Sequence, residues 1–63
     1  MMFEKYDCVR LKSDARAGIY NVEYAVMRVS GFWIFRSYDI VTVDGTGQRI
    51  IREKVKESEL EEF

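Results

Sequence analysis

A turn at Asp44-Gly45-Thr46-Gly47 is the feature that most restricts what this chain can fold into. Asp-Gly between two β-forming runs is typical of a hairpin, because glycine tolerates the positive φ that tight hairpin turns require. The flanking residues 32–44 and 48–55 are rich in the aromatic and β-branched residues that favour strands. We therefore expect two antiparallel strands joined at this turn.

Two further strands are expected before the hairpin. In residues 7–12, Val9 and Leu11 alternate with Cys8, Arg10 and Lys12, which is the period of a half-buried strand. The small and polar residues 13–18 predict a loop. Residues 19–29 form a long β-rich segment with Tyr20, Val22, Tyr24 and Val26 on one face, and Ser30-Gly31 predicts a turn after it. Both faces become apolar from Ala25 onward, which predicts a bulge or a strand covered on both sides.

The C-terminal segment allows two interpretations. In the first, residues 57–63 make one short helical or 3₁₀ turn, from which Leu60 and Phe63 fold back on the core. In the second, residues 51–63 form a longer helix, because Glu, Lys and Leu are good helix formers. The apolar positions 51, 55, 60 and 63 fit a helical stripe only loosely, so we favour the short turn.

The size of the chain limits how its apolar residues can be used. Its 63 residues predict a single domain spanning residues 1–63. It has one cysteine, Cys8, and no histidine, so the residues for an internal disulfide or a structural zinc site are missing. Hydrophobic residues make up 48% and aromatic residues 14%, which is high for so small an interior. Part of this apolar material should therefore lie at the surface or in an interface.

Charge and hydropathy give no reason to expect a membrane partner. The formal net charge is −1, and the longest apolar runs have four residues, far short of the roughly 20 needed to span a bilayer. Residues 1–5 lack the apolar core of a signal peptide. We therefore expect a cytoplasmic location.

The order of these segments resembles a known class of small barrels. Asp7-Cys-Val-Arg-Leu-Lys-Ser13 is similar to the opening of many SH3-like barrels, and Gly18-Ile-Tyr-Asn-Val22 resembles their second strand. Tyr38-Asp-Ile-Val-Thr-Val-Asp-Gly45 resembles the strand and turn of Tudor-like and KOW-like modules, and Val55 followed by Ser58-Glu-Leu60 resembles their last strand and closing 3₁₀ turn. The resemblance implies a mostly β fold, an SH3-like barrel of about five strands with a short C-terminal helical or 3₁₀ turn.

The residues for common enzyme chemistry are missing. Without histidine, histidine-based triads are excluded. Cys8 lies among alternating strand residues, with Asp7 and Arg10 nearby, and a nucleophilic cysteine would need a helix end or a base to lower its pKa. We therefore interpret it as a plain strand cysteine. Asp39 and Asp44 do not form a catalytic carboxylate pair, because residues five apart point to opposite faces of a regular strand. Gly45-Thr-Gly47 lacks the lysine and the following helix of a phosphate-binding loop. We expect a non-catalytic protein with no cofactor and no metal.

The aromatic residues of the middle segment predict an interaction surface. If residues 32–35 form a strand, neighbouring side chains point to opposite faces, and one core cannot bury all four. Trp33→Ser and Phe35→Ser should then have opposite consequences, one unfolding the chain and the other impairing association. We predict that the chain self-associates as a dimer or higher oligomer, or binds another protein, through Tyr24, Phe32, Trp33, Phe35 and Tyr38.

Other uses of this surface stay open. A nucleic-acid binder would stack bases on these rings and contact phosphates through Arg10, Lys12, Arg28 or Arg36, and the KOW-like resemblance implies the same use. The Tudor-like resemblance implies an aromatic cage for a cation such as methyl-lysine, built from Tyr24, Trp33, Tyr38 and Asp39. In a last alternative, Leu60 and Phe63 shield the outward ring within the monomer.

Overall fold

The hairpin predicted from Asp44-Gly45 is present and joins two long strands of the protein. The computed structural model describes residues 2–63, in which β3 (Ser37–Val43) and β4 (Arg49–Lys56) pair antiparallel. Asp44 stabilises the loop, because its carboxylate Oδ1 accepts hydrogen bonds from Thr46 N–H at 2.8 Å and Gln48 N–H at 2.9 Å. The glycine that needs positive φ is Gly47 (φ +84°) and not Gly45, as in a type I turn followed by a bulge.

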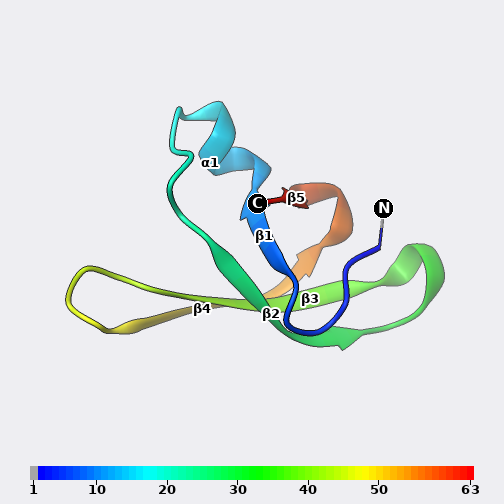
Figure 1. Cartoon of the computed structure of the whole chain (residues 1–63). Helices are drawn as coiled ribbons and strands as arrows, with labels where there is room; N and C mark the ends of the chain where they lie inside the picture. The colour runs from blue at the N-terminus through cyan, green and yellow to red at the C-terminus, as the bar shows by residue number, and fades with distance from the viewer. Residues whose placement is uncertain (1) are drawn as a thin grey trace.

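Five antiparallel strands make one sheet, so the prediction of a mostly β fold of about five strands is confirmed. The order across the sheet is β4-β3-β2-β1-β5, where β1 spans Cys8–Leu11, β2 spans Tyr24–Ser30 and β5 spans Leu60–Glu62. Figure 1 shows β1 running steeply to the long β3 and β4 strands, with the short β5 beside it, so that the sheet is strongly bent. The first and last strands of the chain are neighbours in the sheet.

Three short helical elements connect the strands. The helix α1 (Lys12–Arg16) replaces the predicted loop after β1, and the segment from there to Tyr24 has no regular structure. A 3₁₀ turn, η1 (Trp33–Phe35), separates β2 from β3, and another, η2 (Glu57–Glu59), separates β4 from β5. The C-terminal 3₁₀ turn was predicted. The long helix over residues 51–63 is wrong, because β4 continues to Lys56.

The core lies between the two bent parts of the sheet, and its members from β1 follow the predicted alternation. Val9 and Leu11 of β1 point inward, as do Tyr24 and Val26 of β2. Among residues 2–63, the buried apolar residues are Phe3, Val9, Leu11, Tyr24, Val26, Tyr38, Ile40, Val55 and Leu60. Every strand contributes to it, since alternate side chains of a strand share one face.

Two bulges bend the strands on either side of β3. The register of β2 against β3 shifts between Val26 and Arg28, which leaves Met27 as the extra residue and confirms the bulge predicted in this segment. A second shift lies in β4, where Lys54 has φ +55° and its N–H donates to the Asp39 carboxylate at 3.0 Å. Asp39 therefore holds a backbone bulge.

Candidate interaction site

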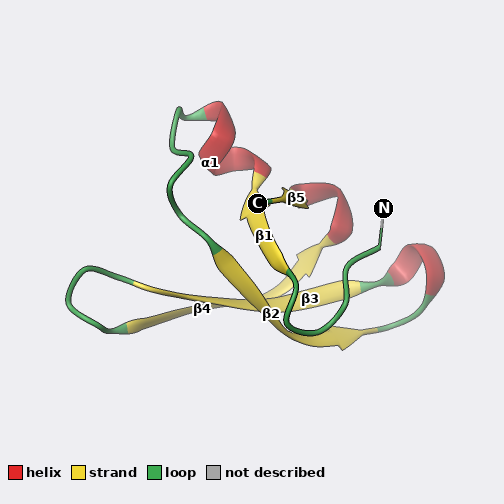
Figure 2. Ribbon diagram, viewed as in Figure 1, coloured by secondary structure: helices red, strands yellow, loops and turns green. Residues whose placement is uncertain are grey.

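Residues 32–35 form an exposed loop, which we call the aromatic tip. The side chains of Phe32, Trp33, Ile34 and Phe35 are 75%, 75%, 74% and 70% exposed. Figure 2 shows η1 as the helical turn between β2 and β3, at the end of the molecule opposite the β3–β4 loop. The predicted strand is wrong here, because the chain turns and Phe35 N–H donates to the Phe32 carbonyl at 3.0 Å. All four side chains are therefore outside the core, and opposite consequences for Trp33→Ser and Phe35→Ser no longer follow.

The backbone of the aromatic tip is strained, which fixes its shape. Gly31 has φ +74°, and a Cβ atom placed there would collide with the backbone carbonyl oxygen of Phe35. Trp33 has φ +54°, a left-handed conformation that costs a residue with a side chain roughly 1–2 kcal/mol. Strained backbone of this kind concentrates at functional sites.

Two rings of the aromatic tip contact each other, and all three rings of the tip remain exposed to solvent. The Phe32 and Phe35 ring centroids are 6.5 Å apart at an interplanar angle of 69°, an edge-to-face pair. Trp33 and Ile34 are exposed on the same turn. At about 150–250 Å² for each aromatic side chain, the three rings present roughly 330–550 Å² to solvent. That is a large apolar patch for a chain of this size.

Tyr24 and Tyr38 are not part of this surface, which corrects the prediction. Both are buried, at 3% and 0% exposure. The Tyr38 hydroxyl accepts from Phe3 N–H at 3.2 Å and donates to Glu57 Oε1 at 2.9 Å. Burial raises the pKa of Tyr38, and its hydrogen bond to the Glu57 carboxylate acts in the same direction, although the Phe3 N–H opposes it. A cation cage built from Tyr24, Trp33, Tyr38 and Asp39 is therefore wrong, because two of its rings lie in the core.

The four basic residues predicted to contact nucleic acid lie in different environments and do not form one surface with the aromatic tip. Arg10 is held by Glu61, at 3.2 Å, and by the Tyr20 and Phe63 rings. Arg36 donates to the Phe3 carbonyl at 2.6 Å and lies 3.7 Å from Glu4. Lys12 is half-buried on α1, and Arg28 is exposed on β2.

Besides Arg36 and Glu57, two lysines accompany the aromatic tip, Lys54 and Lys56. Both are exposed on β4, and they line a hollow together with Ile34 and Phe35. The sequence pattern does not connect these lysines with residues 32–35, because pairing across a sheet is not visible in local periodicity. The alternation of Lys54 and Lys56 around the buried Val55 was the available indication that two lysines share the exposed side.

Phe63 does not cover the aromatic tip. Leu60 packs in the core as predicted. The Phe63 ring instead lies against the Arg10 guanidinium, 4.9 Å from its centroid, and stays 45% exposed. Shielding of the aromatic tip within the monomer is therefore wrong.

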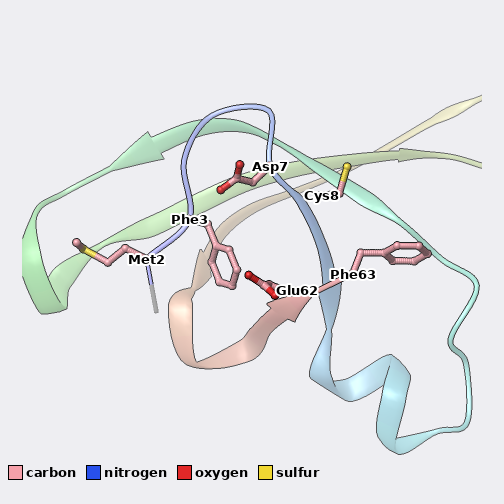
Figure 3. A pocket seen from close by; sticks show the side chains of 6 residues that line it. All are labelled: Met2, Phe3, Asp7, Cys8, Glu62 and Phe63. Atoms are coloured by element: carbon pink, nitrogen blue, oxygen red, sulfur yellow. The ribbon is translucent and has the colours of Figure 1, made fainter.

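An acidic pocket lies between the N-terminal segment, β1 and β5. Its lining, drawn in Figure 3, consists of Met2, Phe3, Asp7, Cys8, Glu62 and Phe63. None of these described lining residues is a lysine or arginine, so its charged groups are two carboxylates. Met2 is 58% exposed and offers a soft apolar wall.

The pocket offers little for nucleophilic chemistry. A hydrogen bond to Glu23 raises the pKa of the Cys8 thiol, with further contributions in the same direction from desolvation and from the charges of Glu23 and Asp7. A thiol with a raised pKa is a weak nucleophile at neutral pH. Across residues 2–63, no cluster of three His, Cys, Asp or Glu side chains is arranged to hold a metal ion, and no helix is long and apolar enough to cross a membrane.

The fold and this surface define a small, mostly β protein with an exposed aromatic loop. Comparison with known protein families, with curated proteins and with solved structures finds no match to the chain.

Proposed function

We propose that this chain is a non-catalytic interaction module that self-associates through the aromatic tip. The observation that carries the proposal is the run of four large apolar side chains, each at least 70% exposed. Leaving such a patch in water is unfavourable, and large exposed apolar patches usually mark interaction sites. Trp and Phe are also among the residues enriched at the cores of protein interfaces.

The fold proposed for this module is the SH3-like barrel. The five antiparallel strands and the 3₁₀ turn near the C-terminus support it, since the sequence resemblance implies both. Such a scaffold supports many functions, so the functional argument rests on the aromatic tip alone. A cytoplasmic location suits the free, exposed thiol of Cys8, which persists in reducing compartments.

Self-association is favoured over nucleic-acid binding because of where the basic residues lie. Arg10 and Arg36 have side-chain exposures of only 16% and 13%, and each is engaged by a carboxylate. Phosphate recognition depends on a free basic footprint. Lys54 and Lys56 share the hollow beside the aromatic tip with Arg36 and the acidic Glu57, which is a small footprint for a polyanion.

Light scattering over a wide concentration range tests the proposal, with Trp33 as an internal probe. Trp33 is the only tryptophan of the chain, so its emission reports directly on the aromatic tip. We expect the mass to rise above the monomer value of 7.5 kDa with concentration while the emission moves to shorter wavelength.

Two variants sharpen the test. Phe35→Ser should abolish association and leave urea unfolding unchanged. Val43→Ser is the matched control, because Val43 is 60% exposed and adjoins the hairpin loop at the opposite end of the molecule. A monomer at every concentration contradicts the proposal. Salt-sensitive oligonucleotide binding by that monomer would assign the aromatic tip to nucleic acid instead.

A further inference from the structure

We infer that the aromatic tip of one copy docks in the acidic pocket of a second copy, and that the contact is made reciprocally. This inference rests on the proposed self-association and adds the surface that receives the aromatic tip. It is argued from area, from charge and from the chemistry of the pocket walls.

The area of the aromatic tip is too small for a stable interface of its own. Its three rings present roughly 330–550 Å², whereas a standard interface buries about 800 Å² on each partner. Two tips meeting face to face would cover only this area on each copy. A reciprocal contact covers more surface, because each copy supplies both a tip and a pocket, and the total lies at the low end of interface sizes, as in weak or transient association. A closed two-fold dimer has this self-complementary form.

The charges of the two surfaces are opposite. Lys54, Lys56 and Arg36 line the hollow beside Ile34 and Phe35, against one carboxylate, Glu57. The pocket carries Asp7 and Glu62, and Glu23 lies beside Cys8 at its margin. Opposite potentials guide encounter and fix the register of docking, while like charges suppress other arrangements. Two tips facing each other would bring the lysines of both copies together, which disfavours that alternative.

The apolar walls of the pocket suit aromatic side chains. Met2 and Phe63 are 58% and 45% exposed, although they flank the buried Phe3. A methionine sulfur next to an aromatic ring makes a favourable contact, and methionine adapts its shape to the group it meets. The pocket thus exposes apolar surface that a ring from the aromatic tip would cover, with carboxylates placed for the lysines that accompany it.

Complementation between two defective variants tests this arrangement. The tip variant is Trp33→Ser with Phe35→Ser, which keeps the pocket. The pocket variant is Met2→Ser with Glu62→Lys, which keeps the aromatic tip. These four residues are exposed, so both variants should unfold in urea like the unmodified chain. Each variant alone should lose association by about tenfold or more, corresponding to at least about 1.4 kcal/mol. An equimolar mixture should regain one of the two contacts and form a mixed dimer.

Charge reversal gives an independent arm. A Lys54→Glu, Lys56→Glu chain should bind the pocket variant better than it binds the unmodified chain, and the gain should shrink in high salt.

The outcomes separate this inference from the proposed function. If the pocket variant associates as strongly as the unmodified chain, the docking site is wrong while self-association stands. If both variants are monomers and their mixture stays monomeric, docking of the aromatic tip in the acidic pocket is overturned. If the unmodified chain never associates, both proposals fail.

Discussion

Replacing Tyr38 with phenylalanine removes one buried oxygen atom that joins three segments of the chain. The hydroxyl receives Phe3 N–H from the N-terminal segment and donates to Glu57 of η2, while the ring itself is 0% exposed on β3. In the variant the ring stays packed edge-to-face against Phe3, at a centroid distance of 5.8 Å in the unmodified protein. The change therefore isolates the hydrogen bonds from the packing.

The magnitude follows from what each partner can do without the hydroxyl. Phe3 is only 4% exposed, so its N–H is left unsatisfied at a cost of about 1–3 kcal/mol. Glu57 is half-buried, so water partly replaces the hydroxyl that its carboxylate loses. The loss of this hydrogen bond should therefore cost less than the roughly 1.5–3 kcal/mol of a full bond to a charged group. We expect Tyr38→Phe to lower the free energy of unfolding by about 2–4 kcal/mol. A chain of this length has only about 3–9 kcal/mol in total.

Urea unfolding followed by far-UV circular dichroism measures the effect, and Tyr24→Phe is its matched control. Tyr24 is also buried, but its hydroxyl accepts only from Nε of the exposed Arg52, at 3.2 Å. In the Tyr24→Phe variant, water takes the place of the hydroxyl at Arg52, so the free energy of unfolding should fall by only about 0.5–1.5 kcal/mol. Equal losses in the two variants would refute the reasoning, as would a Tyr38→Phe variant as stable as the unmodified chain.

Three further predictions concern pH and the turns. Because the folded-state pKa of Tyr38 lies above its usual value of 10.0, stability should be full below pH 10 and fall as pH rises through the folded pKa; Tyr38→Phe should lack this component in unfolding measured from pH 9 to 12. Hydrogen bonds, of which the one from the Thr46 hydroxyl contributes most, lower the pKa of Asp44 below 3.8. The stability that the Asp44 carboxylate contributes should therefore be present above pH 3.8 and be lost as pH falls through the lowered pKa. An NMR titration that gives a pKa of 3.8 or more would contradict this. Gly31→Ala should destabilise the chain more than Gly47→Ala, because both residues have positive φ but only an added Cβ at Gly31 meets backbone atoms; equal unfolding midpoints would argue against the tip geometry.

Local patterns predicted the parts of the fold that local physics determines. The alternation of Val9 and Leu11 and the Asp44 turn each depend on residues close in sequence, and the structure contains both. Residues 32–35 misled the same reasoning, because β propensity describes side chains that pack on a sheet and this loop packs on nothing. The turn there depends on the backbone of Gly31 and Trp33, for which Ser30-Gly31 was the sole indication.

The candidate site was predicted in part, for a related reason. Its exposed members Phe32, Trp33 and Phe35 follow from the surplus of aromatic residues over interior. Tyr24 and Tyr38 were placed at the surface because their burial depends on distant partners. Tyr38 bonds to residues 35 and 19 positions away, and such pairings are invisible to periodicity.

The pairing of β1 with β5 determines how the protein would respond to a pulling force. Val9 lies opposite Glu62 and Leu11 opposite Leu60, so the outer ends of the two strands are side by side. Tension applied to the chain on either side of this pair would load its backbone hydrogen bonds one after another and not all at once. The sheet would therefore open like a zipper at low force, exposing Val9 and Leu60 before the β3–β4 hairpin is disturbed. Mechanical resistance would thus depend on one short ladder and on the bonds that hold Phe3 and Tyr6 to β2 and β3, whatever the resistance to urea.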